Sequence, residues 1–162
     1  MKIELKNVKY SDFASHETHC FEAAVYIDGK RAGTVENDGQ GGCNFYHPRE
    51  MEEALRAHAK TLPKVRYREH EFDQDADTLI SDLLVQHLYT KDLKRALNKR
   101  ILFVTDDGVL RETFNLERQK MENILASPSV KTQLKAQKIL NLLPFDEALS
   151  LYINHSVGAN HA

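Results

Sequence analysis

The 162-residue chain contains no tryptophan, only two cysteines and four prolines, and no long apolar run. Its longest apolar stretches, such as residues 101–104, are far shorter than the ~20 residues that a membrane-spanning helix needs. The first residues alternate polar and apolar side chains as a strand does, without the order of regions found in a signal peptide. We therefore expect a cytoplasmic protein with reduced thiols and no membrane contact.

A dominant charge sign is also lacking. The chain has 22 Lys and Arg against 24 Asp and Glu, a formal net charge of -2. We therefore do not expect a positive electrostatic field that would bind nucleic acid non-specifically. The densest basic run, within residues 91–100, is interpreted as the solvated face of a helix.

The pattern of apolar residues predicts an α+β protein. Residues 21–27 place apolar side chains at every second position, and Asp28-Gly29 follows as a hairpin turn before a strand at 32–37. Residues 1–10 are predicted to add a third strand. A helix is expected to start at Pro48 and to end before Pro63. This beginning is a small N-terminal antiparallel sheet plus a helix.

A helical region with a second β-hairpin is predicted to follow. An apolar stripe from residue 75 to 88 predicts a helix, with a second segment ending near residue 99. The second hairpin joins residues 101–104 to residues 109–114. The remaining elements expected are short helices near 115–126 and 129–137, a buried strand at 138–143 and a last helix from Pro144.

The length suits a single α+β domain over residues 1–155. Within it, subregions 1–63 and 75–155 are expected to be joined by the charged segment 64–74, which has no apolar period. Residues 156–162 are expected to be a frayed tail.

A glycine-rich loop at residues 37–48 is the most informative stretch, because three of the seven glycines fall within four successive positions, 39 to 42. Glycine adopts positive φ and permits close approach, which suits a ligand loop. The side chains after it, from Asn44 to His47, are of the amphipathic kind that interfaces favour. We take residues 37–47 as the predicted contact surface. Its predicted binding residues are Asn37, Asp38, Gly39, Gln40, Gly41, Gly42, Asn44, Tyr46 and His47.

The same loop supports other hypotheses. Backbone amides beside a helix start bind phosphates, although neither G-x-x-x-x-G-K-[ST] nor a Rossmann fingerprint is present. Cys43 near His47 is the arrangement a thiol enzyme would need, but no third orienting residue is identified. A metal site is a further alternative, although the spacings fit no strong zinc pattern. Its potential ligands are His16, His19, Cys20, Cys43 and His47.

Two resemblances bear on function. The strand, hairpin and helix at the start resemble three-stranded sheet modules that read DNA, such as the arm-binding domains of integrases, with Lys30-Arg31 at the hairpin tip. This implies nucleic-acid binding through the sheet as an alternative. The chain as a whole resembles small uncharacterised accessory proteins of bacteria and their phages, a likeness that implies no activity. The stretches that carry it are Cys20-Phe21-Glu22-Ala23, Gly41-Gly42-Cys43-Asn44, Lys99-Arg100-Ile101-Leu102 and Leu142-Leu143-Pro144-Phe145.

The expectation from the sequence is a non-catalytic binding module without a cofactor. Its predicted partner is a host protein or protein complex, and a phage or mobile-element protein of this kind would inhibit or modulate a host defence complex by surface contact. This role follows from the resemblance rather than from individual residues.

Overall fold

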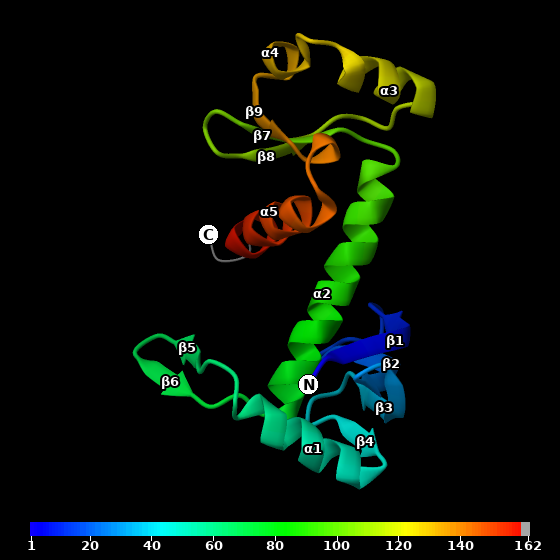
Figure 1. Ribbon diagram of the computed structural model, residues 1–162, viewed down its shortest axis with the longest axis vertical. Coiled ribbons are helices and arrows are strands. Elements are labelled where there is room, and N and C mark those ends of the chain that lie inside the picture. The colour runs from blue at the N-terminus through cyan, green and yellow to red at the C-terminus, as the bar shows by residue number, and fades with distance from the viewer. Residues whose placement is uncertain (160–162) are drawn as a thin grey trace. The chain divides into compact units, whose positions relative to one another are not determined.

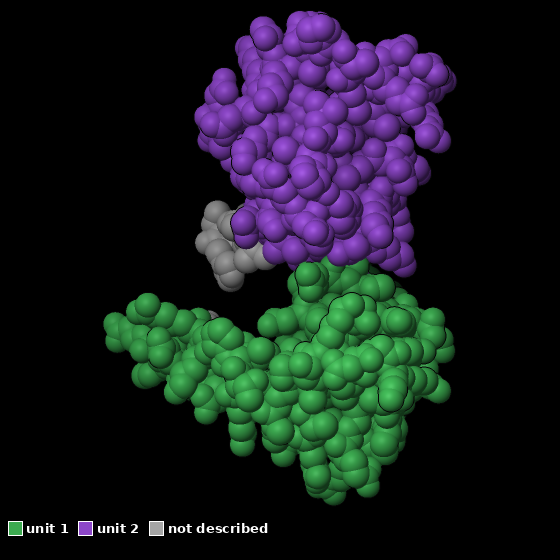
Figure 2. Space-filling model, in the orientation of Figure 1, with its two compact units in different colours: residues 1–87 green, residues 88–162 purple. Residues whose placement is uncertain are grey.

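The computed structural model describes residues 1–159 and confirms the α+β class, with helices and antiparallel sheets (Figure 1). The chain packs into two compact units, residues 1–87 and 88–162 (Figure 2). The division falls inside one long helix, α2 (Ala76–Leu97), which contributes residues to both units. The sequence pattern instead favours an internal boundary in segment 64–74.

Unit 1 is built on a four-stranded antiparallel sheet in the order β1-β2-β3-β4. The predicted first hairpin is confirmed: Asp28 and Gly29 have φ of 48° and 81°, as a two-residue turn between twisted strands requires. The third strand predicted at residues 1–10 is present as residues 3–11, at the edge of the sheet beside β2. The strands are β1 (Ile3–Ser11), β2 (Cys20–Ile27), β3 (Lys30–Asp38) and β4 (Phe45–His47).

One face of this sheet is buried and is called the inner face here. Phe21, Ala23, Val25 and Val35 on it are less than 10% exposed. The predicted helix after Pro48 is present as α1 (Arg49–Ala59), which lies along β4 and buries Met51, Leu55 and Ala59 (Figure 1). The first turns of α2 also face this side of the sheet, and together the two helices close the core of unit 1.

Strand β4 is not predicted by the sequence, in which residues 37–47 are interpreted as one loop. It pairs with β3 through Thr34↔His47, Val35↔Tyr46 and Glu36↔Phe45. Three residues are too few to show a period of two, so the strand has no detectable pattern of its own. The pairing gives Phe45, Tyr46 and His47 alternating directions.

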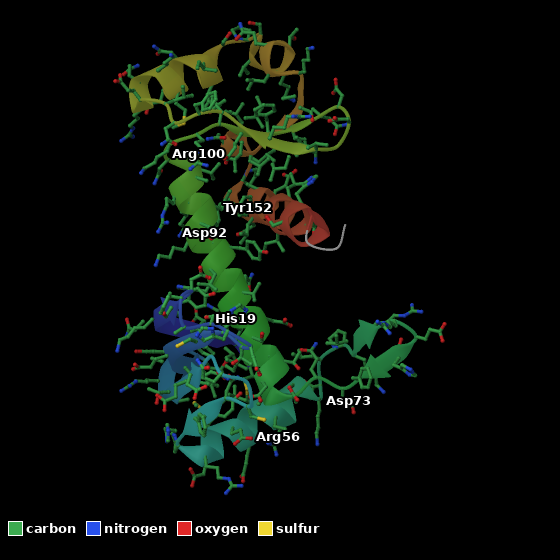
Figure 3. All side chains as sticks on the ribbon, turned by 180° about the vertical axis from the view of Figure 1, so that it is seen from behind. His19, Arg56, Asp73, Asp92, Arg100 and Tyr152 are labelled. Carbon is green, nitrogen blue, oxygen red and sulfur yellow. The ribbon has the colours of Figure 1, made fainter. Side chains whose placement is uncertain are left out.

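Segment 64–74, for which the sequence predicts no strand, also contains β-structure. It forms a hairpin of β5 (Val65–Tyr67) and β6 (His70–Phe72), which projects as an arm from the body of unit 1 (Figure 2). At its open end Lys64 Nζ lies 3.5 Å from Asp73 Oδ1. Asp73 is labelled in Figure 3, at the base of this hairpin. The β6 strand shows no apolar alternation because its side chains face solvent rather than a core.

Helix α2 is continuous, whereas the sequence predicts two segments. The Asp75 carboxylate Oδ1 accepts the backbone N–H of Thr78 at 2.8 Å, which caps the first turn. This bond also holds the pKa of Asp75 below its ordinary value.

Unit 2 contains a three-stranded sheet in the order β8-β7-β9, which confirms the second hairpin. Its central strand is buried on both faces. Leu102 and Val104 pack on the side of Ala148 and Leu149, and Ile101 and Phe103 pack with Met121 and other apolar residues. The elements are β7 (Leu102–Thr105), β8 (Leu110–Glu112), α3 (Arg118–Ala126), α4 (Val130–Leu134), β9 (Ala136–Ile139), η1 (Leu140–Leu142) and α5 (Phe145–Ala159).

The predicted strand at 138–143 is wrong from residue 140, where a 3-10 helix replaces it, and strand β9 begins at Ala136, within the range predicted as a helix at 129–137. Asn141 explains the change. Its Oδ1 accepts the Leu102 N–H at 2.9 Å, and its Nδ2 donates to the carbonyls of Leu97 at 3.3 Å and Arg100 at 2.9 Å. These bonds tie the turn to the end of α2 and the start of β7.

The predicted frayed tail covers residues 156–162. Helix α5 continues through Ala159, and positions 160–162 lie outside the described residues. Among the residues that the structure describes, no helix has the length and apolar content to cross a membrane.

Candidate functional site

Asn37 lies near the end of β3, and its side chain organises the hydrogen bonds of the glycine-rich loop that follows. The residue is 6% exposed, and its Oδ1 accepts from Thr18 Oγ1 at 2.7 Å and from the Gly39 N–H at 2.9 Å. Its Nδ2 donates to the Gly42 carbonyl at 3.3 Å and to Asn44 Oδ1 at 3.1 Å. The side-chain amide of Asn37 is therefore fully used: one bond joins it to Thr18 in the loop between β1 and β2, and three bonds stabilise the glycine-rich loop itself.

Gly39 lies where the same two loops touch. Its carbonyl accepts the N–H groups of His16 at 3.0 Å, Glu17 at 3.0 Å and Thr18 at 3.4 Å. Its φ is +82°, and a Cβ at this position would lie 2.2 Å from the Ala14 carbonyl oxygen. Glycine is required here by both the backbone conformation and the close approach.

Three amides of the loop donate to the protein's own side chains. The Gly39 N–H binds Asn37, the Gln40 N–H binds Asp38 Oδ1 at 3.1 Å, and the Gly41 N–H binds Thr18 Oγ1 at 3.3 Å. A phosphate cradle needs such amides to point at a ligand. In this conformation the three amides stabilise the loop instead.

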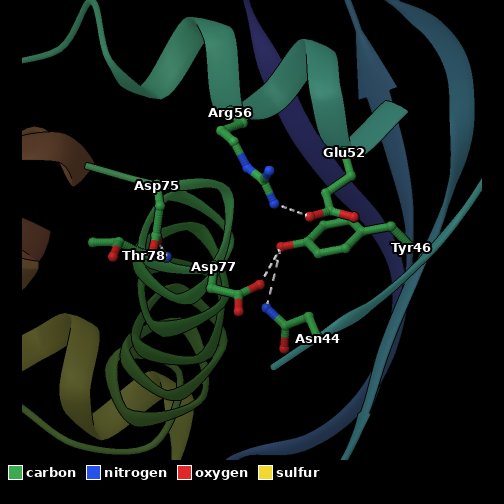
Figure 4. Close-up of polar contacts among 7 residues, drawn as sticks. All are labelled: Asn44, Tyr46, Glu52, Arg56, Asp75, Asp77 and Thr78. Atoms are coloured by element: carbon green, nitrogen blue, oxygen red, sulfur yellow. Dashed lines mark hydrogen bonds and ion pairs between the residues drawn. The ribbon is translucent and has the colours of Figure 1, made fainter. Parts of the chain in front are cut away.

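The Tyr46 side chain connects β4 to α2 through a hydrogen bond (Figure 4). Its hydroxyl donates to Asp77 Oδ1 at 2.6 Å and accepts from Asn44 Nδ2 at 3.4 Å. The side chain is 9% exposed, and burial together with the bond to the Asp77 carboxylate raises the pKa of Tyr46 far above its ordinary value. Tyr46 is thus an internal anchor and offers little surface to a partner.

Cys43 is also held near Asp77. The negative charge of Asp77 and a hydrogen bond to it raise the pKa of the Cys43 thiol, which disfavours the thiolate that a nucleophile needs. His47 points to the other face of the sheet, with Nε2 at 3.9 Å from Glu36 Oε1. The thiol and the imidazole therefore do not form the nucleophile and base pair that a thiol enzyme needs.

The five predicted metal ligands are not assembled into a centre. Across residues 1–159, no three or more His, Cys, Asp or Glu side chains converge in a way that would hold a metal ion. Both cysteines are free thiols.

The face of the sheet opposite α1 and α2 is called the outer face here. The register places Lys9, Glu22, Glu36 and Phe45 in one row across all four strands. Lys9 Nζ pairs with Glu22 Oε2 at 3.1 Å. Phe45 is 59% exposed at the end of the row, although it belongs to a strand.

A hollow of about 560 Å³, the outer groove, lies along this row. Its charged lining consists of the carboxylates of Glu22, Glu36 and Asp38 and the ammonium of Lys9. Phe45 forms one border, and Ser11 and Cys20 contribute smaller side chains. The groove thus combines an exposed ring with an excess of acidic groups.

A smaller pocket of about 290 Å³ lies on the inner side, between the glycine-rich loop and the start of α2. Thr18, Asn37, Asn44 and Asp77 line it, and all four take part in the hydrogen bonds described above. Its polar groups therefore have a structural role already.

The structure distributes the predicted binding residues over both sides of the sheet. Asp38 lines the outer groove, Gly42 and Asn44 line the inner pocket, and Asn37 borders both. Gly39 stabilises the contact between the two loops, and Tyr46 packs in the core of unit 1.

Sequence reasoning missed Lys9, Glu22 and Glu36 as surface candidates. Their signal was present, because Glu22 is a polar position between the apolar residues of a predicted strand and so belongs on its solvent face. Which other strands lie beside it depends on long-range pairing, which no local pattern reveals.

Comparisons of the chain with protein-family models, with curated proteins and with solved structures find no match.

Proposed function

We propose that this protein is a non-catalytic binding module that contacts a partner protein through the outer groove of unit 1. The single observation that carries the proposal is the position of Phe45. A phenylalanine ring that is 59% exposed borders a hollow of about 560 Å³ on a sheet face lined with charged groups. Aromatic side chains in such settings are frequent anchors of protein interfaces.

The arrangement of chemical groups favours binding over catalysis. The Cys43 thiol is not activated, and Tyr46 is a buried hydrogen-bond donor to Asp77. Duplex DNA, the alternative partner, would meet the three carboxylates of the groove, which repel phosphates. The proposed partner is therefore a protein.

The proposed setting is the cytoplasm, where the free thiols of Cys20 and Cys43 would stay reduced. The resemblance to accessory proteins of bacteria and phages supports a host protein complex as the partner, which this chain would inhibit or modulate by occupying a surface.

Selection from a random peptide library displayed on phage tests this proposal even though the partner is unidentified. The full chain is immobilised, selected peptides are synthesised, and their Kd is measured for the wild type and for Phe45→Ala. Loss of a central aromatic anchor costs ~2 kcal/mol, so we expect Kd to rise about thirtyfold.

Phe72→Ala is the matched control, because Phe72 is 55% exposed in unit 1 but lies on the β5–β6 arm. We expect it to change Kd less than about twofold. Selected peptides that bind Phe45→Ala as tightly as the wild type, or a selection that yields no binders, would contradict the proposal.

A further inference from the structure

We infer that the outer groove recognises a basic segment of the partner, in which Lys or Arg side chains flank an apolar side chain. This inference rests on the proposed function and adds the chemistry of the partner. It depends on the balance of charge around the groove, where the carboxylates of Glu22, Glu36 and Asp38 stand against the single ammonium of Lys9.

The strand register places two of these carboxylates side by side. Glu22 and Glu36 are direct neighbours on β2 and β3, so two carboxylates lie opposite each other on one face. Like charges in this position are unfavourable within a sheet. A cationic side chain placed between them would relieve the repulsion and gain a hydrogen-bonded ion pair.

Contacts within the protein compensate the negative charges of these three carboxylates only in part. Lys9 neutralises Glu22, whose side chain remains 51% exposed. Glu36 has the imidazole of His47 at 3.9 Å and is 53% exposed. Asp38 accepts a backbone N–H from Gln40, a neutral group that leaves its charge uncompensated. Glu36 and Asp38 are thus the acids most available to a ligand.

The apolar part of the recognition comes from Phe45. It is the direct cross-strand neighbour of Glu36, so the ring and the carboxylate project side by side from the same face. A segment that packs an apolar side chain on Phe45 therefore brings its neighbouring residues over Glu36. Apolar contact supplies affinity, and the carboxylates select for positive charge.

The peptide selection described above provides the probes. Peptides that depend on Phe45 are sequenced, and we expect enrichment of Lys and Arg over the unselected library. Their binding is expected to weaken about tenfold between about 0.05 and 0.5 M NaCl, because exposed ion pairs are screened by salt.

The double variant Glu36→Gln, Asp38→Asn removes both charges while keeping the size and an acceptor oxygen of each side chain. We expect the Kd of the basic peptides to rise about three- to tenfold. Glu50→Gln, Glu53→Gln is the matched control, since it removes two exposed charges from α1 that do not line the groove. It is expected to change Kd less than about twofold, the effect of distant screened charges.

Lys9→Gln gives a result of the opposite sign. It removes the cation that competes for Glu22, and the same peptides are expected to bind about two- to threefold more tightly. A purely structural role of Lys9 would weaken binding or leave it unchanged.

Failure of this inference is distinguishable from failure of the proposed function. The inference of a basic segment is wrong if the peptides that require Phe45 are neutral or acidic. It is also wrong if their Kd is unaffected by Glu36→Gln, Asp38→Asn. In both cases the outer groove remains the proposed binding surface. A second copy of this chain seated on the groove, seen as a dimer that Phe45→Ala dissociates, likewise overturns the inference of a basic segment. Peptides indifferent to Phe45→Ala overturn both.

Discussion

The hydroxyl of Tyr46 donates a 2.6 Å hydrogen bond to the carboxylate of Asp77, 31 positions away in the chain. It joins the middle residue of a short edge strand to the first turn of α2 and closes the inner side of unit 1. The loop before β4 is thereby held from both ends, at Asn37 and at Tyr46. The Phe45 ring beside it consequently points to the outer face.

Tyr46→Phe removes this bond without changing the shape of the core. Hydrogen bonds to charged groups contribute about 1.5 to 3 kcal/mol, so we expect the free energy of unfolding to fall by that amount. Urea denaturation followed by circular dichroism measures it. Tyr10→Phe is the control, because the hydroxyl of Tyr10 makes 3.4 Å contacts to Asp12 and His19, at the long end of the hydrogen-bond range. Equal stability of the two variants would show that the bond to Asp77 contributes nothing.

Comparing the free energies of unfolding of Gly39→Ala and Gly29→Ala separates the cost of positive φ from the cost of a steric clash. Both glycines have φ near +80°, but an added Cβ meets the Ala14 carbonyl at Gly39 and meets nothing within 4 Å at Gly29. Positive φ costs ~1 kcal/mol for alanine in either case. We expect Gly39→Ala to lose about 2 kcal/mol more in urea unfolding because of the clash. Similar losses for the two variants would mean that the contact with Ala14 is unimportant.

Asp75 gives α2 a pH-dependent cap. The hydrogen bond from the Thr78 N–H lowers the pKa of Asp75 in the folded protein. The ionised carboxylate therefore stabilises the folded state at pH values above the unfolded pKa of about 3.9. This stabilisation is lost as the pH falls through the lower pKa of the folded state. Asp75→Ala is expected to cost ~1 kcal/mol at pH 7. Asp75→Asn keeps a cap that does not titrate, so its stability should depend less on acid than that of the wild type. An unchanged acid dependence of urea unfolding in Asp75→Asn would refute this assignment.

The thiol of Cys43 provides a chemical probe of the same region. Because Asp77 raises the pKa of Cys43, alkylation by iodoacetamide at about pH 8 should be slower than for an unfolded peptide of the same sequence. Asp77→Asn is expected to accelerate it. Mass spectrometry of the peptide that contains Cys43 separates its modification from that of Cys20. A rate that is indifferent to Asp77→Asn would show that the carboxylate does not control the thiol.

The sequence predicts the elements whose patterns are local. The apolar alternation from Phe21 to Val25 and the turn at Asp28-Gly29 suffice for the first hairpin, because burial on one face imposes a period of two. The run from Ile101 to Val104 is apolar on both faces, as a strand covered on both sides should be.

The sequence does not reveal contacts between distant segments. Thr18 with Asn37, and Tyr46 with Asp77, are side-chain pairs whose partners no spacing rule connects. The glycine-rich loop stands out in the sequence, but the close approach of Gly39 to the Ala14 carbonyl, which the structure shows, cannot be read from it. The outer groove likewise exists only once four strands are aligned in register.

The central claim is that the outer groove at Phe45 is the binding surface. The most direct measurement is an NMR titration of the isotopically labelled full chain with a selected peptide, observing backbone amides. The account predicts that the largest shifts occur at Lys9, Glu22, Glu36, Asp38 and Phe45, on one face of the four-stranded sheet. The largest shifts at Thr18, Asp77 and Ser81, around the inner pocket, or on the β5–β6 arm, would contradict it.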